Sequence, residues 1–454
     1  MTSRLFSFAC AGFLLLALLL GGASRGEVIA PDIVGLLALP LLGWAIWRLR
    51  APRPSGDSPS AEAMAFAILG GCFLVGLIQL VPLPPALWTA LPGRAPYVAD
   101  LAAAGFAPGW APISLKPQAT VSALLTLIPA AAVFLSLRTL DQPGRRRLVL
   151  VIIGVAVVSA VVGGLQVIGG RDSPLRFYAV TNPEPAVGFF ANRNHLAALF
   201  VCIVPFATLE VLEAAARRPA GKMRIVLMLA LIGLAAAGVA MTQSRAGALL
   251  LGVALLGGVA MAWRSGLGKG RGRLMLAGGA IVMALAALSA PIFFAGTFDR
   301  FEGGFTGDLR LQAAQVAAGA AWTYAPFGSG LGSFVPVYML HETPASMQNT
   351  YVNHAHDDWL ELLVEGGLLA VAVMLAFLIW FGRQAVRAWR RHQAGQGTGG
   401  GVGARAASLV IGLLLAHSLV DYPLRTAAMM CVFALACGLM LAPRGDPAPG
   451  APPV

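Results

Sequence analysis

Apolar runs of membrane-spanning length follow one another along this 454-residue chain. Each run has about 17–22 residues, enough for a helix to cross the roughly 30 Å hydrocarbon core of a bilayer. Backbone groups in hydrocarbon must be hydrogen-bonded within the protein, which leaves helices and closed barrels. A barrel would show alternating segments of about ten residues. The pattern, in a chain that is 58% hydrophobic and 11% charged, predicts an all-α polytopic membrane protein.

The runs predict twelve transmembrane helices. They cover residues 5–22, 28–47, 62–81, 119–137, 148–168, 195–212, 225–243, 246–263, 274–295, 358–381, 405–421 and 426–442. The first run follows Arg4 and ends in GGAS, so a cleaved signal peptide is an alternative. More runs follow it without a soluble domain between them, which favours an uncleaved first helix.

The distribution of basic residues predicts the orientation. With twelve spans, 22 of the 32 Lys and Arg fall on one side, mostly in five basic loops, and ten fall on the other. The positive-inside rule makes the basic side, with both termini, cytoplasmic. The stretch 353-NHAHDDW then faces outward. A nucleic-acid partner is a poor interpretation of the net charge of +12, because the basic residues form no single patch with interleaved aromatics.

The stretch 353–367 gathers the ionisable groups of an otherwise apolar chain. It holds His354 and His356 just before a predicted span, and Asp358, Glu361 and Glu365 at positions i, i+3 and i+7 of that span. Such spacing places the three carboxylates on one helix face, and a carboxylate as deep as Glu365 should face the bundle interior. A capped helix beside a neutral interfacial histidine would also explain the pattern.

Three outward arginines stand in unusual contexts. Arg193 begins a span in FFANRNHLAALF, Arg245 interrupts two apolar runs in TQSRAGALL, and Arg310 opens an amphipathic segment, 309-LRLQAAQVAAGAAWTY, in the long outward loop 296–357. Arginine is costly at this depth unless it faces protein, water or an anion, and its planar fork suits phosphate oxygens. Arginines converging with a histidine would suit a lipid-linked diphosphate. The alternative is that each one snorkels to the interface.

Other signatures are missing from the sequence. The five cysteines all lie inside predicted spans without metal-ligand spacing, so packing is the favoured interpretation. There is no P-loop, no DxD or DDxxD pair, and no ladder of charges at the centre of the spans. These observations favour a site without metal or cofactor, and they argue against an ion path.

Five stretches together resemble the O-antigen ligase family, which includes O-antigen ligases, Wzy-type polymerases and pilin oligosaccharyltransferases. The stretches, in order along residues 188–425, are GFFANRNHLAALF, TQSRAGALLL, LRLQAAQVAAGAAWTYAPFGSGLGSF, NHAHDDWLELLVEGGLLA and HSLVDYPLR. The family's histidine motif is His, then Asn, Ser or Gln, then nine residues, and then G-x-x-G. Starting from His356 the first Gly is Gly367, whereas Asp357 replaces the amide and Ala370 the second Gly. Starting from His354, Glu365 would occupy the Gly position.

The resemblance implies a membrane glycosyltransferase of the C type that acts without metal and with inversion. It would transfer glycan from undecaprenyl diphosphate to an acceptor hydroxyl at the periplasmic face of the bacterial inner membrane. His356 would be the base, supported by His354 and oriented by Asp358 or Glu361. Arg245, with Arg193 and Arg310, would bind the departing diphosphate.

The resemblance also divides the chain into three parts. Residues 1–187 match only as apolar spans, residues 188–442 form the catalytic core with loop 296–357, and residues 443–454 read as a disordered tail. A ligase would use lipid A core as acceptor, and a polymerase of O-antigen, capsule or exopolysaccharide would use a second lipid-linked glycan; the sequence does not separate them. A lipid-linked oligosaccharide transporter and a non-catalytic scaffold are further alternatives.

Overall fold

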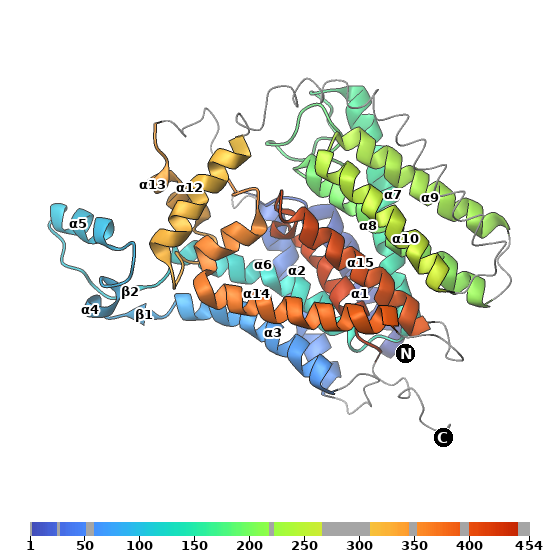
Figure 1. Ribbon diagram of the computed structural model, residues 1–454, viewed down its shortest axis with the longest axis horizontal. Helices are drawn as coiled ribbons and strands as arrows, with labels where there is room; N and C mark the ends of the chain where they lie inside the picture. Colours follow the sequence, from blue (N-terminus) through green and yellow to red (C-terminus); the bar gives the residue numbers. More distant parts are fainter. Residues whose placement is uncertain are drawn as a thin grey trace.

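The computed structural model describes residues 2–24, 28–50, 59–217, 222–265, 309–344, 352–390 and 399–443. These residues are almost entirely helical (Figure 1). The long helices are α1 (Thr2–Leu20), α2 (Ile29–Leu49), α3 (Pro59–Gln79), α6 (Pro117–Leu137), α7 (Gln142–Gly169), α8 (Arg193–Arg217), α9 (Lys222–Thr242), α10 (Arg245–Arg264), α14 (Asp358–Arg390), α15 (Gly399–His417) and α16 (Ala427–Leu439). Eleven predicted spans each overlap one of them, and the span predicted at 274–295 lies outside the described residues, as does all of the predicted tail except Pro443.

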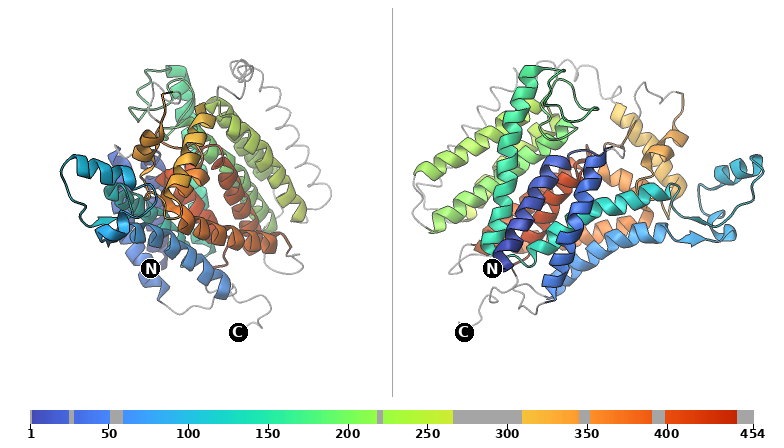
Figure 2. Two further views of the ribbon diagram at one scale, coloured as in Figure 1. Left: turned by 60° about the vertical axis from the view of Figure 1, so that its left-hand side comes forward. Right: turned by 180° about the vertical axis from the view of Figure 1, so that it is seen from behind.

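Seven of these helices (α2, α3, α6, α7, α8, α10 and α14) are long and apolar enough to cross a membrane, and α1, α9, α15 and α16 contain shorter apolar helices. The chain is therefore an all-α polytopic membrane protein. Helix α8 is buried along nearly its whole length, packed by α7, α9, α10 and α15. In α2, α3 and α14, by contrast, fewer than a third of the residues in the apolar window are buried within the protein. Their exposed apolar surface suits contact with lipid, since apolar side chains there need no protein cover. Figure 2 shows α1 lying beside α7.

Short elements connect the long helices at one end of the bundle. They are β1 (Pro82–Leu83), α4 (Pro85–Trp88), α5 (Ala95–Ala103), β2 (Ala111–Pro112), α12 (Leu309–Tyr324), α13 (Phe334–His341) and the 3₁₀ helix η2 (Pro423–Arg425). Strands β1 and β2 form a two-residue antiparallel pair, which extends beyond the ends of α3 and α6 (Figure 1). The short helix predicted from 309-LRLQAAQVAAGAAWTY is α12.

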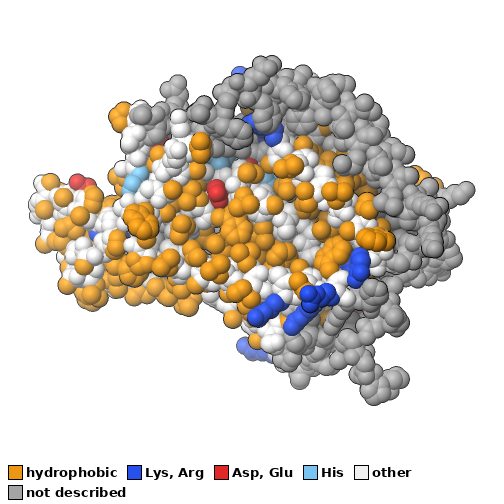
Figure 3. Space-filling model, in the orientation of Figure 1, with side chains coloured by type: hydrophobic (Ala, Val, Ile, Leu, Met, Phe, Trp, Pro, Cys, Tyr) orange, Lys and Arg blue, Asp and Glu red, His pale blue; other side chains and the backbone are white. Residues whose placement is uncertain are grey.

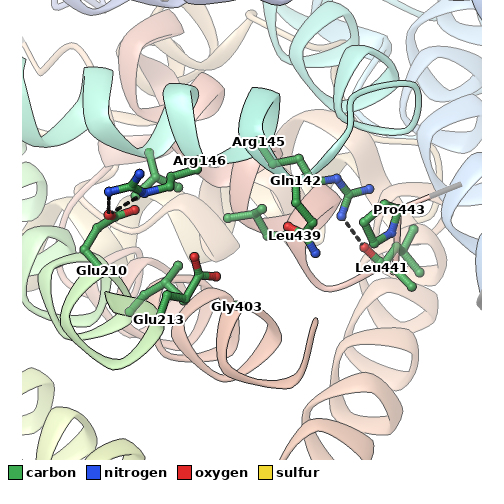
Figure 4. A pocket seen from close by; sticks show the side chains of 12 residues that line it. Gln142, Arg145, Arg146, Glu210, Glu213, Gly403, Leu439, Leu441 and Pro443 are labelled. Atoms are coloured by element: carbon green, nitrogen blue, oxygen red, sulfur yellow. Dashed lines mark hydrogen bonds and ion pairs between the residues drawn. The ribbon is translucent and has the colours of Figure 1, made fainter. Parts of the chain in front are cut away.

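Arginines gather at the opposite end of the bundle, here called the basic end, which contains Arg48, Arg138, Arg145, Arg146 and Arg405. Figure 3 shows exposed Lys and Arg side chains along the lower right of the face it draws. Several are tied to neighbouring elements. Arg138 Nε donates to Glu62 Oε1 (2.9 Å), and Arg145 Nη1 donates to the Leu441 carbonyl oxygen (2.7 Å). Around the pocket in Figure 4, Arg146 of α7 points toward Glu210 of α8, 2.7 Å away. These bonds hold the ends of α3, α6, α7, α8 and α16 together.

Helix α14 is broken at Gly367. This residue has φ 59° and ψ −156°, a conformation that is essentially restricted to glycine. The break releases backbone groups that a continuous helix would pair, and the loop 325–333 takes them up. Ser329 N–H donates to the Val364 carbonyl oxygen (3.0 Å), Gly330 N–H to that of Glu365 (2.9 Å), and Leu368 N–H to that of Pro326 (2.8 Å). The span predicted at 358–381 is thus two helices that meet at a loop.

The loop 325–333 and helices α12 and α13 form a small module on the first half of α14. Ala317, Tyr324, Phe334 and Val337 share a buried apolar cluster with Val364. Ala355 belongs to the same cluster and Val352 packs against it. The module therefore sets the position of both histidines of the stretch 353–367.

The substitution Gly367→Ala should destabilise the protein. An alanine Cβ would lie 2.3 Å from the Pro326 carbonyl oxygen, and the backbone conformation alone costs about 1–3 kcal/mol for a residue other than glycine. Gly382→Ala in the same helix is the control, because its Cβ would meet no atom within 4 Å. We expect thermal unfolding in detergent to occur at a clearly lower temperature for Gly367→Ala and at an unchanged or higher one for Gly382→Ala. Equal unfolding temperatures would show that the break is not required.

Candidate functional site

The site is built on the loop that enters α14. Asp357 caps the helix, since its Oδ1 accepts from Trp359 N–H (2.9 Å) and Leu360 N–H (3.1 Å). Asp357 is therefore the N-cap residue of α14. The residue before it, His356, has φ 53°, a left-handed conformation that is uncommon outside glycine and clusters at functional sites. The turn directs the His356 side chain away from α14 and toward the segment after α15.

His356 is paired with Asp421. Its Nδ1 lies 3.3 Å from Asp421 Oδ1; the imidazole is 28% exposed and the carboxylate 1%. Asp421 also accepts from the side chain of Asn194 and from Tyr422 N–H (3.0 Å). Burial opposes ionisation of Asp421, but the His356 hydrogen bond and nearby imidazoles outweigh it, so its pKa lies below the ordinary range. A carboxylate at Nδ1 fixes the tautomer in which Nε2 is unprotonated and can accept a proton.

His354 is held differently. Its Nδ1 lies 2.8 Å from Glu361 Oε1, and its Nε2 lies 3.3 Å from the Ser24 carbonyl oxygen. Carboxylate and carbonyl oxygens only accept hydrogen bonds, so both contacts are made when both ring nitrogens carry a proton. Burial lowers the pKa of His354, but the charge and hydrogen bond of Glu361 raise it by more, and the net shift is upward. His354 therefore favours the imidazolium form and is a poor base.

Arg425 binds the three carboxylates of α14. Its Nη1 lies 2.8 Å from Glu365 Oε2 and 3.4 Å from Glu361 Oε1, and its Nε lies 3.3 Å from Asp358 Oδ1. Burial lowers the pKa of Arg425, but the carboxylates raise it above its ordinary value. Glu365 is 1% exposed, as predicted for a carboxylate at that depth. The spacing i, i+3, i+7 thus places all three carboxylates around the guanidinium of Arg425.

Tyr422 lies among three imidazoles. Its ring centroid is 4.2 Å from that of His354, 5.0 Å from that of His356 and 5.0 Å from that of His195. Burial, aided by the charge of Asp421, raises the pKa of Tyr422 to about 12. Tyr422 is therefore neutral at physiological pH, and its ring separates the two histidine–carboxylate pairs.

The carboxylate beside His356 is neither of the two predicted orienting residues, Asp358 and Glu361. Asp358 and Glu361 are hydrogen-bonded to Arg425 and His354, and Asp421 is the carboxylate at His356. Asp421, Tyr422 and Arg425 all lie in HSLVDYPLR, which carried the resemblance without a predicted role. The sequence feature that could have identified these residues is a carboxylate and an arginine in a short polar interruption between two apolar runs.

The predicted arginines begin helices. Arg193 starts α8 and is half-buried, beside Asn194, which contacts Asp421. Arg245 starts α10 with an exposed side chain. The first turns of α8 and α10 pack closely, since a Cβ at Gly247 would lie 2.7 Å from Ala197 Cβ. Arg310 is the second residue of α12, and its side chain lies outside what the structure describes.

A large cavity lined by both polar and apolar residues opens beside His354, whereas His356 does not line it. It has a volume of about 1660 Å³, counting the open solvent at its mouth. His354, Glu361, Glu365 and Arg425 line one wall, and the beginnings of α2 and α6 line another. Within the described ranges, no three His, Cys, Asp or Glu side chains are grouped so as to hold a metal ion.

Taken together, the fold and the site define a polytopic membrane protein with a paired histidine and carboxylate at the end away from the basic loops. Residues 227–375, about a third of the chain, match the family model described as O-antigen ligase (Wzy_C), so the protein contains an O-antigen ligase domain. That family includes ligases and Wzy-type polymerases and is consistent with a role in polysaccharide or lipopolysaccharide biosynthesis. The matched residues include Arg245, Arg310, His354 and His356, whereas Asp421 and Arg425 lie beyond them. No curated protein matches the chain.

The charge of His354 can be tested through pH. A folded-state pKa above the unfolded value of about 6.5 means that the His354–Glu361 pair stabilises fully below that pH and is lost as pH rises through the raised pKa. We expect His354→Gln to lower the unfolding temperature most near pH ~6 and least near pH ~9. The measurement is thermal unfolding in detergent across this range.

Glu361→Gln provides the control, because it removes the partner carboxylate. In the Glu361→Gln protein, adding His354→Gln should lower the unfolding temperature by an amount that does not decrease as the pH rises. A pH-independent effect of His354→Gln in the wild-type background would mean that His354 is neutral.

Proposed function

We propose that this protein is a glycosyltransferase of the periplasmic face, O-antigen ligase-like, that moves glycan from undecaprenyl diphosphate to an acceptor hydroxyl. The observation that carries the proposal is the His356–Asp421 pair, in which the carboxylate is buried and the imidazole reaches the surface. His356 lies in the matched O-antigen ligase domain. Its geometry leaves Nε2 free of the carboxylate, as a general base requires.

In the proposed reaction, His356 Nε2 takes the proton of the acceptor hydroxyl as its oxygen attacks the anomeric carbon of the donor. The new bond forms between acceptor oxygen and carbon, and the bond from that carbon to the diphosphate oxygen breaks, with inversion. Asp421 fixes the His356 tautomer and stabilises the imidazolium that forms. Arg193 and Arg245, which begin two neighbouring helices, bind the departing lipid diphosphate, with Arg310 as a third candidate. The sugar–diphosphate bond is already activated, and the proposed steps use no metal or cofactor.

The proposed topology follows from the two ends of the bundle. The basic end would be cytoplasmic, with twelve spans in the inner membrane. Both Ser7 near the start of α1 and Leu441 after α16 are hydrogen-bonded by arginines near the start of α7, Arg147 and Arg145. The first and last described segments of the chain, around Ser7 and Leu441, therefore lie on one side, and the histidine loop lies on the other. This arrangement supports cytoplasmic termini and a periplasmic site.

The decisive assay is glycan transfer by purified protein in detergent, from an undecaprenyl-diphosphate-linked glycan, with EDTA present. Lipid A core is supplied in one arm and only more lipid-linked glycan in the other. Product on lipid A core identifies a ligase, and lengthened lipid-linked chains identify a Wzy-type polymerase, the alternative that the family match equally allows.

Substitutions assign the roles in that assay. His356→Ala should lower kcat by at least about a hundredfold, the range of a lost general base. Asp421→Asn should lower kcat by about tenfold or more, since an amide can hold the wrong tautomer. Arg245→Ala should also lower kcat by about tenfold or more. Asp172→Asn and Arg171→Ala, exposed residues of another loop, are the matched controls. If His356→Ala retains wild-type turnover, the assigned base is wrong.

A further inference from the structure

One connection between the long helices is almost free of charge. Residues 81–115, between α3 and α6, contain β1, α4, α5 and β2 and are here called the arm. Arg94 and Asp100 are its only charged residues. Arg94 is buried, and its guanidinium carbon lies 5.5 Å from the centroid of the Tyr324 ring of α12. Asp100 is therefore the one charge that the arm exposes.

Hydrogen bonds fold the arm back on itself and fix its base. Trp88 Nε1 donates to the Gly109 carbonyl oxygen (2.7 Å), and strands β1 and β2 pair where the arm leaves the bundle. Leu115 N–H donates to the Ser329 carbonyl oxygen (2.8 Å), which joins the arm to the loop 325–333. The arm therefore lies on the side of the histidine loop and is attached to the module on α14.

The arm exposes large apolar side chains. Phe106 and Trp110 are 66% and 70% exposed, and Val81 and Leu87 are each more than half exposed. Helix α5 has no buried residue. These side chains therefore contribute little to packing within the chain. An exposed apolar surface of this kind marks a contact with a ligand, a protein or a membrane.

The exposed surface of the arm continues the lipid-facing surface of α3. Leu74, Leu77 and Ile78 are exposed near the end of α3, and Val81 follows them. Helix α3 is long and apolar enough to cross a membrane, and 28% of the residues in its apolar window are buried, so its exposed apolar face contacts lipid. Figure 1 shows the arm extending from this end of α3, and Figure 3 shows hydrophobic side chains on the arm and on the neighbouring face of the bundle.

We infer that the arm lies in the interface of the bilayer, between lipid headgroups and acyl chains, on the side of the histidine loop. The hydrocarbon core is excluded, because it would leave backbone groups of the irregular segment 104–110 unpaired. The interface contains water and headgroups that can bond these groups. Aromatic side chains such as Trp110 favour this depth. A protein partner would find Asp100 as the only exposed charge with which to fix its orientation on the arm.

The inference rests on the membrane spans and does not depend on the proposed function. It also gives the arm a role in the fold. Contact with lipid holds the arm at the membrane surface, and the Leu115–Ser329 bond and the Arg94–Tyr324 contact connect the arm to the module that positions the histidine loop.

Spin labels test the position of the arm. A nitroxide is attached to the cysteine of Phe106→Cys or of Trp110→Cys, in full-length protein in phosphatidylcholine nanodiscs that each hold one chain. Leu77→Cys on the exposed face of α3 is the control for contact with lipid, and Asp172→Cys, an exposed position just after α7, is the control for contact with water. The unsubstituted protein, treated with the same reagent, corrects for labelling of the native cysteines.

We expect the labels at positions 106 and 110 to collide more often with oxygen, which concentrates in lipid, than with a water-soluble nickel chelate. Their depth should be about 5–10 Å into the boundary of headgroups and acyl chains. The label at position 172 should show the reverse preference. A preference for the nickel chelate at positions 106 and 110 would place the arm in water and overturn the inference. Protection from both reagents would reveal a protein on the arm and would overturn it as well.

The native Trp110 provides a second measurement without a label. Its fluorescence is the difference between the emission of the wild-type protein and that of Trp110→Phe. We expect lipids that are brominated near the top of their acyl chains to quench this difference signal, and aqueous iodide to leave it unchanged. Quenching by iodide alone would show that the Trp110 ring lies in water, and the inference would then fail.

Discussion

The break of α14 at Gly367 is the constraint on which the rest of the site depends. Backbone groups freed by the break are bonded by the loop 325–333, so the loop and the half-helix 358–366 fix each other. Gln79 of α3 adds a side-chain bond to the Glu365 carbonyl oxygen (2.8 Å). Leaving a buried backbone N–H or C=O group unpaired costs free energy. The hydrogen bonds between the loop and the half-helix therefore favour this one arrangement of the two. The orientation of the half-helix then decides where its carboxylates point.

The carboxylates of this half-helix need positively charged partners, and Arg425 and His354 are those partners. A buried carboxylate without a partner would cost about 3–5 kcal/mol, so the segment that supplies Arg425 must lie against α14. The same segment supplies Asp421 four residues earlier, and with it the partner of His356. Charge pairing in α14 therefore positions the pair proposed for catalysis, although Arg425 itself makes no bond to His356.

The sequence predicted local features well and long-range partners poorly. The spans follow from hydrophobic length, and α12 follows from its amphipathic pattern, because both signals lie within one element. The burial of Glu365 followed from its depth in a span. The partner of His356 could not be predicted in this way, since Asp421 is 65 residues away and the nearer Asp358 and Glu361 fit the same chemistry. The family spacing located Gly367, but its role as a break became visible only from its φ value and the loop packed against it.

The two histidines of the stretch 353–367 show how environment separates identical side chains. Both have a carboxylate at Nδ1, so that contact alone does not distinguish them. The difference lies at Nε2, where His354 meets the Ser24 carbonyl oxygen. A second acceptor favours the doubly protonated form of the His354 ring, which lies between the Ser24 carbonyl oxygen and Glu361 of α14. Among the residues that the structure describes, no second acceptor lies at His356, and its imidazole is more exposed. The left-handed backbone at His356 produces this difference, since it turns one ring toward Asp421 while its neighbour two residues earlier remains against Glu361.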